Sequence, residues 1–215
     1  MISHVSYEAP VGITSIEPDV TVPDGLWDIV VIRHRDGVQV LQTGLITKPV
    51  LLSYEPGDEY LAISFKPGWY MPRLPGERMV DRGVLRPLGE GRSFELDADT
   101  FEIPTFENAE GLVERLVQRE IVRLDDIVDR VADGEPVWAS ERTVERRFRW
   151  TLGLTPTQLV QIRRAGEAVA KLRAGAAPAQ VAADLGYADQ PHLTRSLRRF
   201  MGQTPGEIGA PAKGS

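Results

Sequence analysis

In the front half of the chain, short runs rich in Val, Ile, Tyr and Phe alternate with turn residues at close intervals. This alternation is typical of β-strands with one buried face. It predicts strands over residues 28–33, 38–42, 50–54 and 60–66. The dipeptide Asp36-Gly37 lies between the first two runs, and both of its residues tolerate positive φ, so we expect a two-residue hairpin turn there.

After Asn108, the spacing of the hydrophobic residues changes to that of a helix. Asn108 is placed to act as the N-cap of this helix. Apolar residues then recur at intervals of three and four residues: Leu112, Val113, Leu116 and Val117. The change of period predicts a domain boundary near residues 100–110. We therefore expect an α+β protein with a β-rich domain over residues 1–105 and an all-α domain over residues 106–215.

Near the end of the chain, the pattern predicts a helix-turn-helix unit. A short helix over residues 179–185 ends at Gly186, and Asp189 caps a second helix with Pro191 in its first turn. The buried stripe of this helix consists of Leu193, Leu197 and Phe200. Its opposite face carries side chains suited to base edges or phosphates: Gln190, His192, Thr194, Arg195, Arg198 and Arg199. The alternative is an ordinary surface helix with solvated charges.

A similar unit precedes it. A helix over residues 125–132 leads through Gly134 and Pro136 to Ser140, which caps a helix with Val144, Phe148 and the stem of Arg147 facing inward. The open face of that helix presents Arg142, Glu145, Arg146 and Arg149. Between the units, Thr155-Pro156 begins a long helix that runs to Gly175 and is expected to act as a rigid spacer.

Charge divides the chain in the same way. Residues 1–110 carry 9 basic and 18 acidic side chains, whereas residues from Pro136 onward carry 12 basic and 6 acidic ones. An acidic front half is repelled by nucleic acid and a basic rear segment is attracted to it, so we expect only the rear half to touch DNA. On charge alone, a solvated basic face explains the rear segment equally well.

Several function classes are disfavoured by what the sequence lacks. It contains no cysteine, its three histidines (His4, His34 and His192) fit no metal-binding spacing, and no phosphate-binding glycine loop or nucleophile elbow occurs. We expect no metal, no cofactor and no enzymatic activity. No apolar run approaches the roughly 18 residues of a membrane helix and the start resembles no signal peptide, so we expect a cytoplasmic protein without membrane association.

The residues from about 125 to 208 resemble the DNA-binding domain of the AraC/XylS family of bacterial transcription regulators. The matching landmarks are Ser140, Val144, Arg146-Arg147-Phe148, Gly153-Leu154-Thr155-Pro156, Ile162-Arg163-Arg164, Val181-Ala182, Leu185-Gly186-Tyr187, Leu193, Arg195, Phe200 and Gly202-Gln203-Thr204-Pro205. The resemblance implies two helix-turn-helix units that read adjacent major-groove segments. Two departures are Pro191, which replaces a potentially hydrogen-bonding side chain, and the long connection over residues 133–139.

By the same resemblance, the base-reading candidates are Arg142, Glu145, Arg146, Gln190, His192, Thr194 and Arg195. The front half is similar to the β-rich sensory domains of some family members, of cupin-like or partial-barrel type, through residues 23–28 and 64–68. Such domains bind effectors or pair subunits, which makes the following residues candidate effector contacts: Trp27, Phe65, Trp69, Tyr70 and Met71. Aromatic residues of a small β domain are also the usual constituents of its core.

Together these observations predict a sequence-specific regulator whose partner is double-stranded DNA. The resemblance also implies a small-molecule effector, RNA polymerase and a second subunit as further partners. The alternative is a small-molecule binding or protein-interaction module with weak or lost DNA binding.

Overall fold

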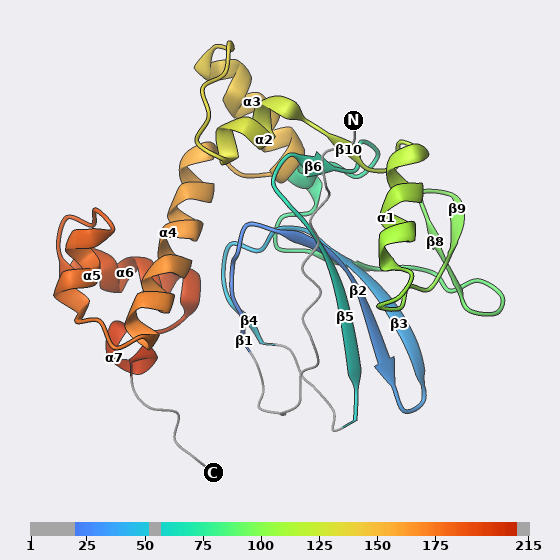
Figure 1. Ribbon diagram of the computed structural model, residues 1–215, viewed down its shortest axis with the longest axis horizontal. Coiled ribbons are helices and arrows are strands. Elements are labelled where there is room, and N and C mark those ends of the chain that lie inside the picture. Colours follow the sequence, from blue (N-terminus) through green and yellow to red (C-terminus); the bar gives the residue numbers. More distant parts are fainter. Residues whose placement is uncertain (1–19, 52–56, 210–215) are drawn as a thin grey trace.

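The computed structural model describes residues 20–51 and 57–209 (Figure 1). Within these ranges the chain forms a β-rich front half and a helical rear half, as the hydrophobic pattern predicts. The expected strand over residues 50–54 lies partly outside the described ranges, and His4 lies wholly outside them.

An open, antiparallel, four-stranded sheet forms the centre of the front half. Its strands are β2 (Trp27–His34), β3 (Gly37–Thr43), β5 (Glu59–Phe65) and β7 (Gly83–Leu85), in the order β5-β2-β3-β7. Alternate residues of β2, namely Trp27, Ile29 and Val31, are buried, so one face of the sheet covers the core. Three of the four predicted strands are thereby confirmed nearly to their ends, and β4 is described only over Val50–Leu51.

The predicted hairpin is present, but its turn lies one residue earlier than expected. His34 pairs with Gly37, so the two turn residues are Arg35 and Asp36. Neither of them has a positive φ, whereas the prediction required positive φ at Asp36. The placement of the turn was wrong because the strand pairing includes Gly37, which has a φ of 159° and begins β3.

Three two-stranded ribbons flank the sheet. β1 (Val20–Thr21) pairs with β4, and β8 (Ser93–Leu96) pairs with β9 (Asp99–Glu102). In the third ribbon, β6 (Trp69–Tyr70) pairs with β10 (Arg123–Leu124), which lies immediately before the first helix-turn-helix unit. This last pairing joins the two halves of the chain and was not predicted.

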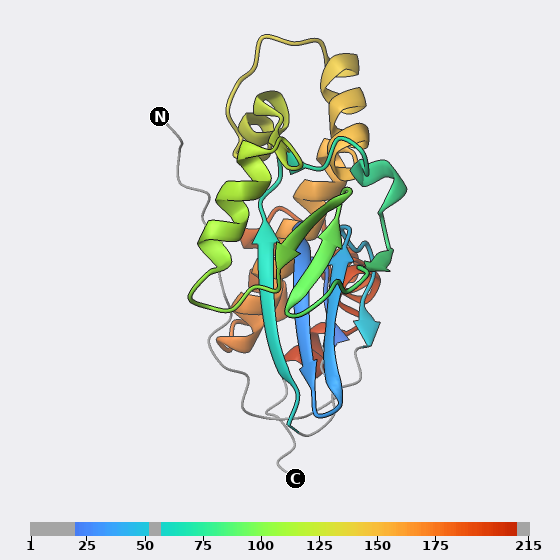
Figure 2. The same cartoon turned by 90° about the vertical axis from the view of Figure 1, so that its right-hand side faces the viewer.

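Helix α1 (Ala109–Gln118) lies beside the sheet and the β8–β9 ribbon (Figure 2). Arg119, which follows the helix, forms an ion pair of 2.7 Å with Asp99 and places its guanidinium over the Phe101 ring. Asn108 occupies the predicted N-cap position, but its side chain accepts a hydrogen bond from the amide of Thr105 and not from the helix. Arg119 therefore links the end of α1 to the β-rich half.

The rear half contains the helices expected from the sequence. They are α2 (Asp126–Ala132), α3 (Glu141–Leu152), α4 (Pro156–Arg173), α5 (Pro178–Asp184) and α6 (Gln190–Met201). A short helix that was not predicted, α7 (Pro205–Ile208), follows them. The caps predicted for α3 and α6 are confirmed: Ser140 accepts from the amide of Thr143, and Asp189 from that of His192. Gly186 has the left-handed φ of 69° that ends the α5 segment. No helix in the described ranges is both long enough and apolar enough to span a bilayer.

Glycines let the two halves approach closely. A Cβ atom at Gly68, just before β6, would lie 2.7 Å from the Cβ of Asp129 in α2. A Cβ at Gly76, in the short 3-10 helix η1 (Gly76–Arg78), would overlap the carbonyl oxygen of Thr151 in α3. The first helix-turn-helix unit is therefore packed directly against the β-rich half, backbone to backbone.

Candidate nucleic-acid interface

Helix α6 presents a polar face because its apolar side chains are all turned inward. Leu193, Leu197 and Phe200 are buried against α4 and α5, as predicted. The side chains of Arg195 and Arg198 are exposed on the opposite face, and neither forms an ion pair within the described part of the chain. These two guanidinium groups are free to meet an anionic partner.

Two other candidates on α6 make local contacts. The Nδ1 atom of His192 accepts a hydrogen bond of 3.3 Å from the amide of Ala188, and its ring lies edge-on to that of Tyr187. The hydroxyl of Thr194 donates to the carbonyl oxygen of Gln190 at 3.0 Å. His192 thus keeps only Nε2 for a partner, and Thr194 keeps only its acceptor capacity.

Helix α3 has the same organisation. Phe148 and Leu152 are fully buried, and the exposed face carries Arg142, Glu145, Arg146 and Arg149. Arg147 differs from its neighbours because it turns inward, where its guanidinium donates to the buried carboxylate of Asp125 at 3.0 Å. The inward position that the sequence indicated for the Arg147 stem is therefore confirmed.

A tryptophan that the sequence analysis assigned no role lies beside α3. Trp138, in the connection between α2 and α3, is fully exposed at two residues before the Ser140 cap. Trp150 on α3 is 41% exposed. In the sequence, the feature that could have pointed to Trp138 is its position as a large aromatic residue within a connection rich in Gly, Pro and acidic residues.

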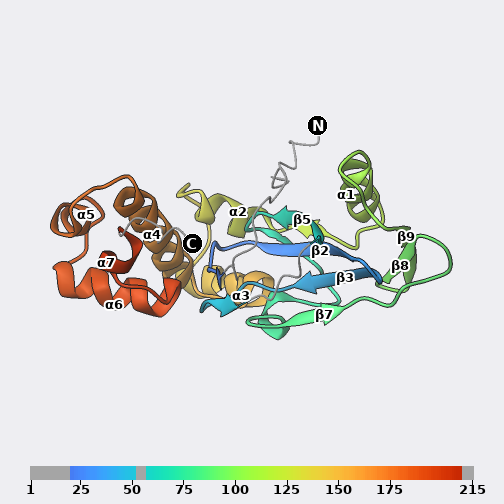
Figure 3. The same ribbon diagram turned by 90° about the horizontal axis from the view of Figure 1, so that it is seen from below.

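The linker helix sets the distance between the two units. α4 has 18 residues, which corresponds to a length of about 27 Å. α3 and α6 lie on one side of it and α2 and α5 on the other (Figure 3). Major grooves on one face of a duplex recur about every 34 Å, a comparable spacing once the flanking elements are included.

The candidate effector residues of the front half are mostly core. The rings of Trp27 and Phe65 are stacked at 4.0 Å, and the Trp27 indole donates to the carbonyl oxygen of Trp69. A cavity of about 20 Å³ lies beside them, lined by Trp27, Tyr70 and Met71 from the front half and by Thr151 from α3. Its volume is about that of one water molecule.

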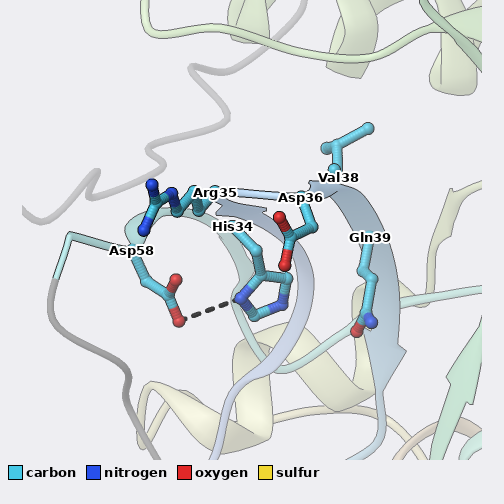
Figure 4. A pocket seen from close by; sticks show the side chains of 7 residues that line it. His34, Arg35, Asp36, Val38, Gln39 and Asp58 are labelled. Carbon is cyan, nitrogen blue, oxygen red and sulfur yellow. Dashed lines mark ion pairs between the residues drawn. The ribbon is translucent and has the colours of Figure 1, made fainter.

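A larger surface hollow of about 660 Å³ lies at the tip of the β2–β3 hairpin (Figure 4). The Nδ1 atom of His34 is 2.9 Å from a carboxylate oxygen of Asp58 there, and Arg35 and Asp36 form part of the rim. Over residues 20–51 and 57–209, no three His, Asp or Glu side chains are grouped in a way that suits a metal ion. The hollow lies at the opposite end of the sheet from α3 (Figure 1).

Comparison with known proteins identifies the rear half. A family model described as a helix-turn-helix domain, of the AraC type, matches residues 137–210, which include α3 to α7. Searches of the curated proteins and of the solved structures found no match. The match extends over the linker helix and the polar faces of both α3 and α6.

Proposed function

We propose that this chain, which carries an AraC-type helix-turn-helix domain, is a sequence-specific DNA-binding transcription regulator that reads two major-groove segments with α3 and α6. The matched domain is a DNA-binding module, so the comparison supports the part of the proposal that concerns contact with DNA. The reading of two segments by one chain is our inference.

The observation that carries the proposal is that α3 and α6, each with exposed polar residues, lie on the same side of the linker helix (Figure 3). Each helix turns its apolar stripe inward, and Arg146 on α3 and Arg195 on α6 are exposed. An α-helix fits the major groove, where an arginine reads the O6 and N7 atoms of guanine by two hydrogen bonds. One chain therefore supplies two reading helices.

We assign different tasks to the ends of each helix. The residues of the first turns are the base-reading candidates: Arg142, Glu145, Arg146, Gln190, His192, Thr194 and Arg195. Further along the helices, Arg149, Arg198 and Arg199 are phosphate contacts, which position a protein without reading sequence.

For the front half we propose a regulatory role. The division into residues 1–105 and 106–215 remains our proposal, with α1 in contact with the β-rich side. A small-molecule effector at Trp27, Phe65, Trp69, Tyr70 and Met71 would act next to Thr151 of α3. A second subunit and RNA polymerase are the further partners that we propose.

The rival proposal is a small-molecule binding or protein-interaction module without DNA binding. It predicts that the exposed arginines of α3 and α6 are ordinary solvated side chains and that their removal changes nothing but the net charge. The two proposals are separated by selecting bound sequences from random DNA with the full chain, because only a sequence reader enriches a common motif.

The geometry of the proposal is tested on the selected site. Footprinting should show two protected blocks about 10 base pairs apart and an asymmetric sequence, since one chain supplies both helices. Inserting about 5 base pairs between the blocks rotates one of them by half a turn. If affinity and protection survive that insertion unchanged, the two-groove proposal is wrong even where the protein is a regulator.

A further inference from the structure

A short segment of the front half has a charge opposite to that of its surroundings. Residues 73–92 contain five arginines and three carboxylates, although residues 1–110 together carry twice as many acidic as basic side chains. The net charge of the whole front half does not reveal this basic segment. It includes η1 and the edge strand β7.

The part of this segment around η1 lies directly against the C-terminal end of α3. The backbone of Gly76 in η1 contacts Thr151 and Leu152 so closely that a Cβ atom would overlap them. On the other side of the contact, a Cβ at Gly153 would lie 2.7 Å from the carbonyl oxygen of Gly76. Arg78 is two residues from this contact, and therefore the front half places an arginine next to the reading helix.

The segment also lies on the same side of the molecule as the two reading helices. β7 and the turn before it lie on the lower side in Figure 3, where α3 and α6 are also found. Figure 2 shows the turquoise turn that contains η1 beside α3, at the same edge. The turn, α3 and α6 therefore lie on one side of the molecule.

Three arginines of the segment, Arg78, Arg82 and Arg92, have no side-chain partner within the described residues, and the first two lie in or next to η1. Arg73 forms an ion pair with Asp97, and Arg86 donates to the side chain of Gln42. Arg78 and Arg82 are exposed and form neither an ion pair nor a side-chain hydrogen bond with any described residue. Their positive charges are therefore not neutralised locally.

The backbone that carries them is held in place. The amide and hydroxyl of Thr47 donate to the Asp81 carboxylate at 2.7 and 2.8 Å, and the carbonyl oxygen of Arg82 accepts from the amide of Gly44 at 2.9 Å. Met79, between the two arginines, is buried. Asp81 is thus engaged with Thr47, which leaves Glu77 as the exposed carboxylate closest in sequence to Arg78.

We propose that Arg78 and Arg82 bind phosphates of the DNA strand that flanks the groove read by α3. The inference rests on the function proposed above and deepens it, because the front half then contributes directly to DNA binding. It also revises the expectation that an acidic front half stays away from DNA. An exposed guanidinium without an ion-pair partner can form charge-assisted hydrogen bonds with a phosphate, and the backbone that carries it is already fixed and needs no ordering on binding.

The test compares the full chain with the double variant Arg78→Ala, Arg82→Ala on two probes: the selected site and a random-sequence duplex of about three helical turns. Phosphate contacts carry no sequence information, so affinity should fall by a similar factor on both probes. The log–log slope of affinity against salt should become shallower by about 0.9 for each lost contact. Lysine at both positions should restore the slope.

The matched control removes two arginines from the same half at a distance from α3. Arg35, in the hairpin turn, and Arg92, before β8, are exposed, and their double alanine variant has the same net charge as the test variant. Its affinity and slope should stay near those of the unaltered chain. An equal loss in the control would overturn the local contact in favour of a general charge effect.

Failure of this inference is distinguishable from failure of the proposed function. If the Arg78, Arg82 variant binds with unchanged affinity and slope while Arg146→Ala weakens binding to the selected site, the front-half contact is wrong and the two-helix reader stands. If the unaltered chain enriches no sequence at all, the proposed function is wrong and the contact with its flanking phosphates is overturned as well.

Discussion

Asp125 accepts a hydrogen bond of 3.0 Å from Arg147, and through this pair one carboxylate joins three parts of the molecule. Its other oxygen accepts from the amides of Ile127 and Val128 and so caps α2. The amide of Asp125 donates to the carbonyl oxygen of Gly68 beside β6. The position of the reading helix α3 is therefore tied to α2 and to the β-rich half at a single residue.

Replacing Asp125 should destabilise the protein by more than an ordinary ion pair would. Asp125→Ala removes a helix cap, worth about 0.5–2 kcal/mol, and leaves the Arg147 guanidinium without its acceptor. We expect the free energy of unfolding, measured by urea denaturation, to fall by about 2 kcal/mol. Lys171→Ala, which breaks the exposed pair with Asp184, is the control and should have a much smaller effect, because exposed ion pairs contribute little to stability. Equal costs would contradict the role given to Asp125.

Arg146 and Arg199 should differ in the kind of binding that they support. Arg146→Ala should lower affinity for the selected site by about 1–3 kcal/mol and relax the preference at one or two base pairs, since we propose that its side chain reads a base edge. Arg199→Ala should weaken binding to all sequences alike. The measurement is titration of both variants against the site and its single-base substitutions. A uniform loss for Arg146→Ala would exclude base reading.

The contact between η1 and α3 should tolerate no side chain at Gly76. Gly76→Ala forces the Thr151–Leu152 backbone away from η1, so we expect a loss of stability and a weaker affinity for the selected DNA site. The control is Gly166→Ala in α4, where a Cβ meets no atom within 4 Å. That change should stabilise the protein by up to about 1 kcal/mol because alanine favours helix. Thermal unfolding of both variants measures the two effects on stability. A Gly76→Ala protein with unchanged stability and unchanged affinity for the selected DNA site would mean that the contact is loose.

Asp28 should make stability depend on pH. Burial raises the pKa of this carboxyl above its usual value, although hydrogen bonds from Ser64 and Thr43 oppose the shift. A raised pKa in the folded state means that stability is greatest when the group is protonated and decreases as pH rises through the folded-state pKa.

Asp28→Asn removes that ionisation. The stability of the variant relative to the unaltered chain should therefore increase as pH rises from the usual carboxyl range toward neutrality. Urea denaturation of both proteins over a series of pH values measures this difference. A difference that stays constant with pH would show that Asp28 does not titrate in this interval.

The helical half could be predicted well because its signals are local. Ser140, Thr155 and Asp189 are capping residues at the first turn of a helix, and each accepts a hydrogen bond from the backbone three residues later. The strands β2, β3 and β5 were also predictable, because one buried face imposes an alternation that is visible in the sequence. The hairpin turn was misplaced because its position depends on strand pairing.

The candidate site was predictable in part for the same reason. Helical periodicity predicts that Arg146 and Arg195 lie opposite the buried stripes of their helices. In the structure both side chains are exposed. Periodicity does not show that the ring nitrogen of His192 accepts from Ala188, or that Trp138 is fully exposed. Those properties depend on how the chain folds around each residue.

The sequence by itself determined the two structural classes, the helix caps, the buried stripes and the positively charged faces, because each depends on residues a few positions apart. Only the tertiary structure decided that β10 pairs with β6, that Asp125 joins α2, α3 and the front half, and that Arg78 lies beside the end of α3. These relations join residues far apart in the chain, and backbone packing across glycines such as Gly68 and Gly76 brings them together. No local sequence pattern predicts such a contact.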